Sequence, residues 1–100
     1  MKIVIQNPKE NPASALRRCG YHFERAHPGT GEISAARAMS AGEFPRLHAY
    51  AKIFGKNLEI NLHLDQKKPS YLGTSAHGGE YDGKIIEEEA ERIRSLLSNN

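Results

Sequence analysis

Two alternating runs on either side of a glycine-containing turn constrain the fold of this chain most strongly. In residues 46–54 and 58–65, apolar and polar side chains alternate, and Gly55-Lys56 lies between the two runs. Alternation of this length is typical of strands that bury one face. Glycine in the first position suits a two-residue type II′ turn. The pattern therefore predicts an antiparallel β-hairpin.

The turn also predicts which residues of the hairpin face each other. A register shift by two residues would keep the faces and change the partners, so the partners depend on the turn. On the apolar face we expect the pairs Ile53 with Leu58, Ala51 with Ile60, Ala49 with Leu62, and Leu47 with Leu64. On the polar face we expect Lys52 with Glu59, Tyr50 with Asn61, His48 with His63, and Arg46 with Asp65.

Capping residues predict two helices. Asn11 suits the N-cap, Pro12 the first helical position and Gly20 the position just past the end, which indicates a helix over residues 12–19. A second helix is expected over residues 84–98, capped by Asp82, because apolar residues recur there at helical spacing. These residues are Ile86, Ala90, Ile93 and Leu97.

Three further segments favour extended structure. The β-branched residues 3–5 predict a short strand that ends before Asn7-Pro8. Residues 21–26 alternate, with His22, Glu24 and Ala26 on one side, and Pro28-Gly29 after them predicts a type II turn in which Gly29 takes a positive φ. We assign residues 33–41 to a returning strand.

These elements predict an α+β fold in one domain covering residues 1–100. We expect an antiparallel sheet of four to five strands with two helices packed on one face, in the order β-α-β-β-β-β-α. Residues 66–83 carry no periodicity and contain four glycines, so they are interpreted as a long loop. Loops of this length inside a compact domain are usually functional or disordered.

Composition excludes several protein classes. No apolar run reaches the length of about 18 residues that spans a bilayer, and the start of the chain is unlike a signal peptide. We therefore expect a cytoplasmic protein with no membrane contact. The single cysteine, Cys19, cannot form an internal disulfide or a paired-cysteine metal site.

The polar face of the hairpin and the 66–83 loop are the candidate binding surface. Such a face can also be ordinary solvated surface, and the loop can simply cover a sheet edge. In the functional interpretation, two imidazoles, cations and hydrogen-bonding groups gather there, and histidine titrates near neutral pH. The candidate binding residues are Arg46, His48, Tyr50, Lys52, Asn61, His63, Asp65, Lys67, Lys68, Tyr71, His77 and Tyr81.

The sequence predicts no cofactor and no metal as its main interpretation. The glycines of the 66–83 loop are not followed by the Gly-Lys-Ser/Thr of a phosphate-binding loop. His63-x-Asp65, with His48 opposite and His77 from the loop, has enough ligands for zinc. However, five histidines in 100 residues produce such groups by chance, so zinc stays an alternative.

Residues 15–25, Ala-Leu-Arg-Arg-Cys-Gly-Tyr-His-Phe-Glu-Arg, resemble the opening of small HicA-type toxin ribonucleases. The fold of that family is similar to double-stranded-RNA-binding domains. Ala26-His27-Pro28-Gly29 stands where the family has its short Gly-Ser/Thr-His segment with the catalytic histidine. The resemblance therefore concerns architecture and assigns no catalytic residue.

No motif specifies a reaction, and whether the protein is an enzyme stays open. The leading hypothesis is a binding module for RNA or another phosphate-bearing partner, although the pI of 8.8 is slightly below the value typical of dedicated nucleic-acid binders. The first alternative is a small hydrolase, such as a HicA-like ribonuclease, that uses two of His48, His63 and His77. The second alternative is a structural or oligomerising module.

Overall fold

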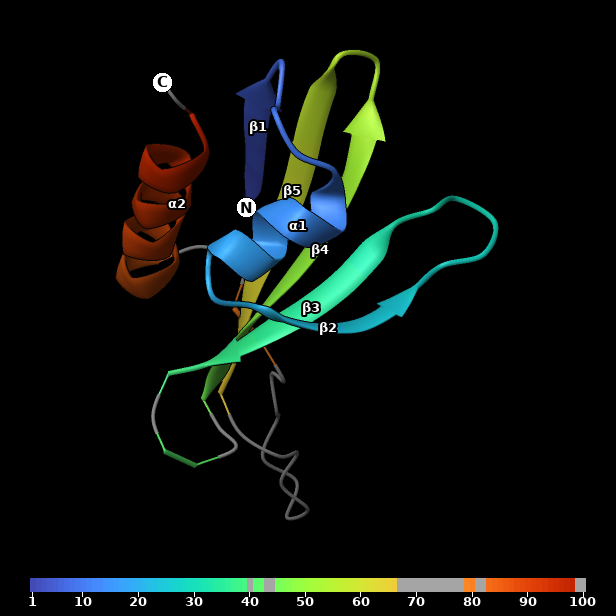
Figure 1. The fold of residues 1–100 in the computed structure, drawn as a ribbon. Coiled ribbons are helices and arrows are strands. Elements are labelled where there is room, and N and C mark those ends of the chain that lie inside the picture. The colour runs from blue at the N-terminus through green and yellow to red at the C-terminus, as the bar shows by residue number, and fades with distance from the viewer. Residues whose placement is uncertain (40, 43–44, 67–78, 81–82, 99–100) are drawn as a thin grey trace.

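The computed structural model describes residues 1–39, 41–42, 45–66, 79–80 and 83–98. It shows the expected α+β architecture, with one antiparallel sheet in the strand order β1-β5-β4-β3-β2 and a short β6 that pairs with β5 (Figure 1). The elements are β1 (Lys2–Gln6), α1 (Pro12–Arg18), β2 (His22–Ala26), β3 (Ile33–Ala38), β4 (Arg46–Phe54), β5 (Asn57–Asp65), β6 (Gly79–Glu80) and α2 (Lys84–Leu97).

Both helices cover the same face of the sheet, where the core lies. Helix α1 crosses β4, β3 and β2, while α2 lies along β1 and β5 (Figure 1). Every second residue of β5 is buried beneath them, as are Leu47, Ala49 and Ala51 of β4, and burial of these side chains supplies the main stabilising free energy. Ile53, which was expected on the same apolar face, is instead 46% exposed, because it lies at the turn end of β4. The sheet contributes Ile3, Ile5, Ala35, Leu47, Ala49, Ala51, Leu58, Ile60, Leu62 and Leu64, and α2 contributes Ile86, Ala90, Ile93 and Leu97.

The β4–β5 hairpin confirms the predicted register at every pair, from Ile53 opposite Leu58 at the turn to Arg46 opposite Asp65 at the far end. Gly55 has a φ of 65°, and Lys56 is not among the residues with positive φ, as a type II′ turn requires. Strand β5 begins one residue earlier than expected, at Asn57. The hairpin lies at the centre of the sheet, between β1 and β3.

The caps of the two helices differ. The side chain of Asn11 accepts a hydrogen bond of 2.8 Å from the Ser14 N–H, which confirms it as the N-cap of α1. Gly20 follows α1 with a φ of 93°, a conformation that glycine adopts without steric cost. Helix α2 has Gly83 at its N-cap, a residue with no side chain that could accept a capping hydrogen bond. Asp82 lies outside the described residues.

The turn between β2 and β3 differs from the predicted type II turn. Gly31, rather than Gly29, takes the positive φ, at 77°. The Gly31 N–H donates to the His27 carbonyl over 2.8 Å, which closes a wider turn. Inside this turn, His27 Nδ1 accepts from the N–H groups of Gly29 and Thr30, at 3.1 and 3.3 Å. The turn is therefore held by hydrogen bonds to the His27 ring, whereas the sequence had predicted a type II turn at Pro28-Gly29.

Strand β2 also departs from simple alternation. The pairing of β2 with β3 shifts between Phe23 and Arg25, so Phe23 lies opposite Ala35 and Arg25 lies opposite Ser34. Such a β-bulge inserts one unpaired residue and changes the direction of the side chains around it. Here the extra residue is Glu24. The bulge directs Glu24 and Arg25 toward the same pocket instead of toward opposite faces.

A buried carboxylate joins α2 to the rest of the fold. Glu89 is only 5% exposed, and it accepts a hydrogen bond of 2.6 Å from the Tyr21 hydroxyl. Arg37 and Arg92 also donate to it, at 3.0 and 2.8 Å for their shortest contacts. Arg92 additionally donates to the Cys19 carbonyl, which ties α2 to the end of α1. Full pairing of this kind is what allows a charge to be buried.

Two smaller expectations concern the ends of the described segments. The returning strand was expected to reach residue 41, but β3 ends at Ala38. Within the region interpreted as a loop, residues 79–80 pair with Leu64 and Asp65 as β6. Neither helix in the described part of the chain has the length and apolar character needed to cross a membrane.

Candidate functional site

The candidate site lies on the face of the sheet opposite the helices. Alternation along β4 and β5 places their polar side chains there, with the apolar neighbours from Leu47 to Ala51 and from Leu58 to Leu64 buried on the other side. His48 and His63 are direct cross-strand partners, as expected. Because neighbouring strands fix the backbone, the side chains that follow are held on a rigid scaffold.

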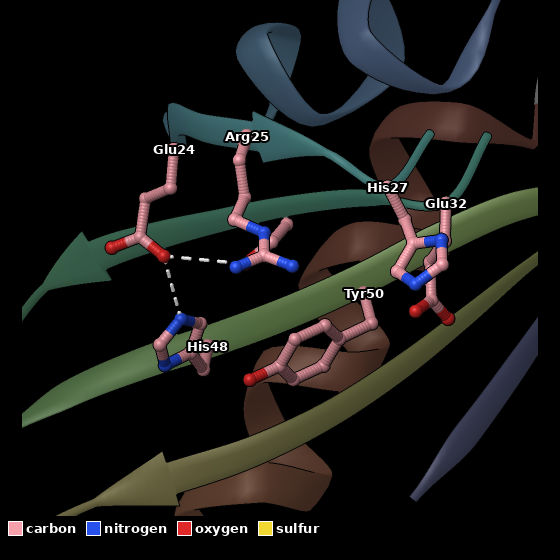
Figure 2. Close-up of a pocket in the computed structure, with 7 residues that line it drawn as sticks. Glu24, Arg25, His27, Glu32, His48 and Tyr50 are labelled. Atoms are coloured by element: carbon pink, nitrogen blue, oxygen red, sulfur yellow. Dashed lines mark hydrogen bonds and ion pairs between the residues drawn. The ribbon is translucent and has the colours of Figure 1, made fainter. Parts of the chain in front are cut away.

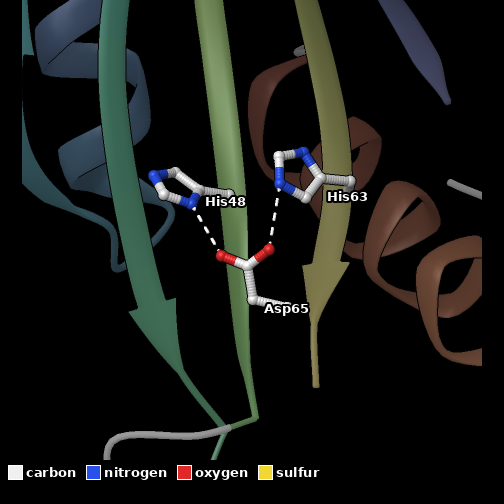
Figure 3. Close-up of side chains that lie close together, drawn as sticks. All are labelled: His48, His63 and Asp65. Carbon is white, nitrogen blue, oxygen red and sulfur yellow. Dashed lines mark hydrogen bonds and ion pairs between the residues drawn. The ribbon is translucent and has the colours of Figure 1, made fainter. Parts of the chain in front are cut away.

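A chain of hydrogen bonds connects two carboxylates and two imidazoles. Glu24 Oε1 lies 2.8 Å from His48 Nε2, and His48 Nδ1 lies 3.0 Å from Asp65 Oδ2. The other oxygen of Asp65, Oδ1, lies 3.1 Å from His63 Nε2. Figure 3 shows the Asp65 carboxylate between the two imidazole rings. Residues from three strands, β2, β4 and β5, therefore form one connected cluster.

The rings in this cluster are nearly parallel. The centroid of His48 lies 5.2 Å from that of Tyr50 and 5.4 Å from that of His63, and Tyr50 lies 5.6 Å from His63. The angles between the three ring planes are 11° to 30°. Offset stacking at these distances is favourable. The three residues form a stacked ring cluster on the sheet surface, and its members restrain one another.

Hydrogen bonds connect His48 to a carboxylate at each ring nitrogen. Because an ionised carboxylate only accepts, each ring nitrogen of His48 can act as the N–H donor to the oxygen that it faces. Burial raises the pKa of Glu24, but the hydrogen bond and charge of His48, helped by Ser34 and Arg46, outweigh it and keep that pKa below its usual value.

The pKa of His63 is also shifted by its neighbours. Partial burial lowers the pKa of His63, the charge of His48 lowers it further, and the neighbouring Asp65 carboxylate opposes both effects. The net result is a pKa below the ordinary histidine value. The nearby His48 ring and the Asp65 carboxylate therefore act on the pKa of His63 in opposite directions.

Arg46 lies beside both carboxylates. Its Nε is 3.5 Å from Asp65 Oδ2, and its Nη1 is 3.9 Å from Glu24 Oε2. The guanidinium group therefore offsets part of the negative charge of the cluster. It is engaged within the cluster, so it contributes less positive charge to an external ligand than the sequence suggested.

A pocket of about 390 Å³ opens beside the cluster. Figure 2 shows the Glu24 carboxylate directed at the His48 ring, with Tyr50 next along β4. Glu24 also accepts a hydrogen bond of 3.2 Å from the Ser34 hydroxyl. The lining residues are Glu24, Arg25, His27, Glu32, Ser34, His48 and Tyr50.

The residues of β4 and β5 in this site were expected from the sequence, whereas those that β2, β3 and the turn between them contribute were not. The residues expected on the polar face that do come together are Arg46, His48, Tyr50, His63 and Asp65. Asn61 lies on the same face opposite Tyr50, and Lys52 lies one residue pair farther toward the turn. Lys67, Lys68, Tyr71, His77 and Tyr81 lie outside the described residues. The missed residues are Glu24, Arg25, His27, Glu32 and Ser34. The bulge that directs Glu24 toward the cluster has no distinct sequence signal.

Comparison with protein-family models, with curated proteins and with solved structures finds no match to this chain. The resemblance of residues 15–25 to HicA-type toxins gains no support from these comparisons. Functional inference therefore rests on the geometry and chemistry of the polar face.

Proposed function

We propose that the protein binds single-stranded RNA on the polar face of its sheet. The observation that carries this proposal is the stacked ring cluster of His48, Tyr50 and His63 on a sheet face that neither helix covers. Unpaired bases stack on aromatic side chains that project from such sheets, and every base offers a flat surface for stacking. RNA in a duplex does not expose its bases in this way.

Two cations beside the rings suit the phosphates of such a strand. Arg25 lines the pocket and Lys52 lies farther along β4, and neither has an ion-pair partner among the described residues. The carboxylates of Glu24 and Glu32 line the same pocket and can accept hydrogen bonds from base amino groups or a 2′-hydroxyl. The pocket therefore offers each kind of contact that one nucleotide requires.

The proposal predicts weak, salt-dependent binding. A strand that contacts three or four phosphates should bind at best with micromolar affinity, with a log–log salt slope of about −2 to −3. Arg25→Gln with Lys52→Gln should make the slope less steep by about 1.4, because two phosphate contacts are lost. Fluorescence anisotropy with mixed-sequence RNA at several salt concentrations measures both quantities.

A matched control removes the same charge from the other side of the molecule. Arg17 and Lys84 are exposed on the two helices, so Arg17→Gln with Lys84→Gln should leave the slope close to that of the wild type. If RNA and DNA oligonucleotides fail to bind at low salt, the proposal is wrong. Equal losses in the two double variants would show a general charge effect and would also contradict it.

The pair of imidazoles favours a second candidate, cleavage of the bound RNA. One imidazole would take the proton of a 2′-hydroxyl while its oxygen attacks the phosphorus, and the other would give a proton to the departing 5′-oxygen. The closeness of His48 and His63 supports this candidate.

End-labelled RNA should shorten on a gel while DNA of the same sequence stays intact, and His63→Gln should abolish cleavage. If the RNA stays intact after prolonged incubation, the cleavage candidate is wrong and RNA binding is the only function proposed.

A further inference from the structure

We propose that His48, His63 and Asp65 bind one divalent transition-metal ion of the zinc class. The three side chains each offer a ligand atom, and these atoms all lie within 4.8 Å of one another. The proposal goes beyond RNA binding and does not depend on it, since it concerns only these side chains and their neighbours. The metal can be tested with no nucleic acid present.

The spacing of the ligand atoms suits a small ion. Zinc bonds of about 2.0–2.2 Å at tetrahedral angles place ligand atoms about 3.3–3.5 Å apart. His48 Nδ1 lies 3.0 Å from Asp65 Oδ2, and His63 Nε2 lies 3.1 Å from Asp65 Oδ1. Both nitrogens therefore already converge on one carboxylate. Loss of the protons they share with Asp65, and side-chain rotations that bring the ligand atoms closer than their present 4.8 Å limit, would let one ion contact all three residues.

The neighbours of the ligands support the same conclusion. Ligating histidines almost always donate their second ring N–H to a carboxylate or carbonyl, which fixes the tautomer and the ring orientation. Glu24 Oε1, 2.8 Å from His48 Nε2, occupies this position on the far side of the ring from Asp65. The stacked Tyr50 ring restrains both imidazoles. Glu24 is thus a positioning residue for His48.

The position of the cluster leaves room for a further ligand. The side chains of His48, His63 and Asp65 are 11%, 17% and 20% exposed, so the cluster is accessible from solvent while its ligands are held in place. Three protein ligands with one open position are typical of catalytic zinc sites, where water or substrate completes the coordination.

The donor set also selects the class of ion. Two imidazoles and one carboxylate suit Zn²⁺, Co²⁺ or Ni²⁺, whereas Mg²⁺ and Ca²⁺ prefer ligand sets made of oxygen. Arg46 Nε, 3.5 Å from Asp65 Oδ2, competes with an incoming ion for that oxygen. The positive charge of Arg46 weakens binding of every cation, so the selectivity comes from the nitrogen donors.

Titration of the metal-free full chain with Zn²⁺ by calorimetry tests the proposal. We expect one ion per chain, and a melting temperature that rises with Zn²⁺ because the ion binds the folded state. His63→Gln removes a ligand and should weaken Zn²⁺ binding by more than about 100-fold, while Glu24→Gln should weaken it by about 10- to 100-fold. Mg²⁺ at the same concentration should give neither effect.

His22→Gln is the matched control. His22 is exposed on β2 and belongs to neither the cluster nor the pocket, so this variant loses an imidazole and should bind Zn²⁺ as the wild type does. Equal weakening by His22→Gln and His63→Gln would show scattered surface binding and would overturn the proposal. Absence of Zn²⁺ binding by the wild-type chain would overturn it as well.

A measurement on the unaltered protein guards against variants that fail to fold. In NMR spectra of the five histidine rings, Zn²⁺ should shift His48 and His63 together at one equivalent. When Co²⁺ is added to the metal-free protein, it should give visible absorption bands, and these bands should disappear when Zn²⁺ displaces the Co²⁺. Ring shifts confined to the other three histidines would contradict the assignment. These measurements use no RNA, so they give the same answer whether or not RNA binds.

Discussion

Replacement of Ile60 by aspartate is expected to unfold the protein. Ile60 is 0% exposed at the centre of the sheet, where it lies opposite Ile3 of β1 and Ala51 of β4. A carboxylate at this position would lie between two buried apolar partners that offer it neither a hydrogen bond nor a counter-charge. An unpaired buried charge costs several kcal/mol, against a total stability of about 5–15 kcal/mol. Circular dichroism should show loss of the folded signal or a melting temperature lowered by tens of degrees.

The neighbouring residue provides the control. Asn61 lies on the polar face and opposite Lys2 of β1, so Asn61→Asp places its new charge near solvent and a cation. Its effect should stay within about 0.5 kcal/mol, as for most surface substitutions. Similar losses of stability in the two variants would mean that the faces of β5 are assigned the wrong way round.

The hairpin was predictable because local and global preferences agree there. Alternation, a glycine in the turn and complementary pairs on both faces all indicate one register, and the structure has that register. Once the faces were known, the closeness of His48, His63 and Asp65 followed from the side-chain period of the strands. The centre of the candidate site was therefore accessible to sequence reasoning.

The rest of the site depends on contacts between distant segments. Glu24 reaches His48 only because β2 contains a bulge, and bulges arise from pairing with a neighbouring strand rather than from composition. Similarly, the glutamates of α2 look alike in the sequence. Glu89 differs from Glu88 because it faces Tyr21 and Arg37, which are far away in the chain. Periodicity identifies a buried face, but it does not identify partners that cross elements.

Glu89→Gln should produce the second large effect, a loss of about 3 kcal/mol in the free energy of unfolding at neutral pH. Burial raises the pKa of Glu89, but hydrogen bonds from Arg92, Arg37 and Tyr21 outweigh burial and lower the pKa from 4.5 to about 2. Each unit of pKa difference between the folded and unfolded states is equivalent to about 1.4 kcal/mol, so the lowered pKa of Glu89 corresponds to about 3 kcal/mol of stability. The amide keeps the size of the side chain but gives two arginines a weaker, uncharged partner, so the loss is electrostatic.

The exposed neighbour Glu88 is the matched control, since Glu88→Gln removes the same charge from the same helix with no hydrogen bond or ion pair recorded for it in the described structure. Urea unfolding at neutral pH should give a change of less than about 0.5 kcal/mol for this variant. If Glu89→Gln proved equally mild, the buried network would contribute little to the attachment of α2.

The dependence on pH gives a sharper test of the same carboxylate. In the unfolded chain Glu89 takes up a proton near its ordinary pKa of 4.5, whereas in the folded protein it stays charged down to a pKa of about 2. Between these values the unfolded state binds more protons, so the stabilisation is complete above about pH 4.5 and is lost as the pH falls toward 2. The stability difference between wild type and Glu89→Gln should therefore shrink to under about half of its neutral-pH value by pH 3, because the protonated carboxyl resembles the amide. A difference that stays constant from pH 7 to pH 3 would show that Glu89 acts through its shape and hydrogen bonding, and that its charge does not hold α2 to the sheet.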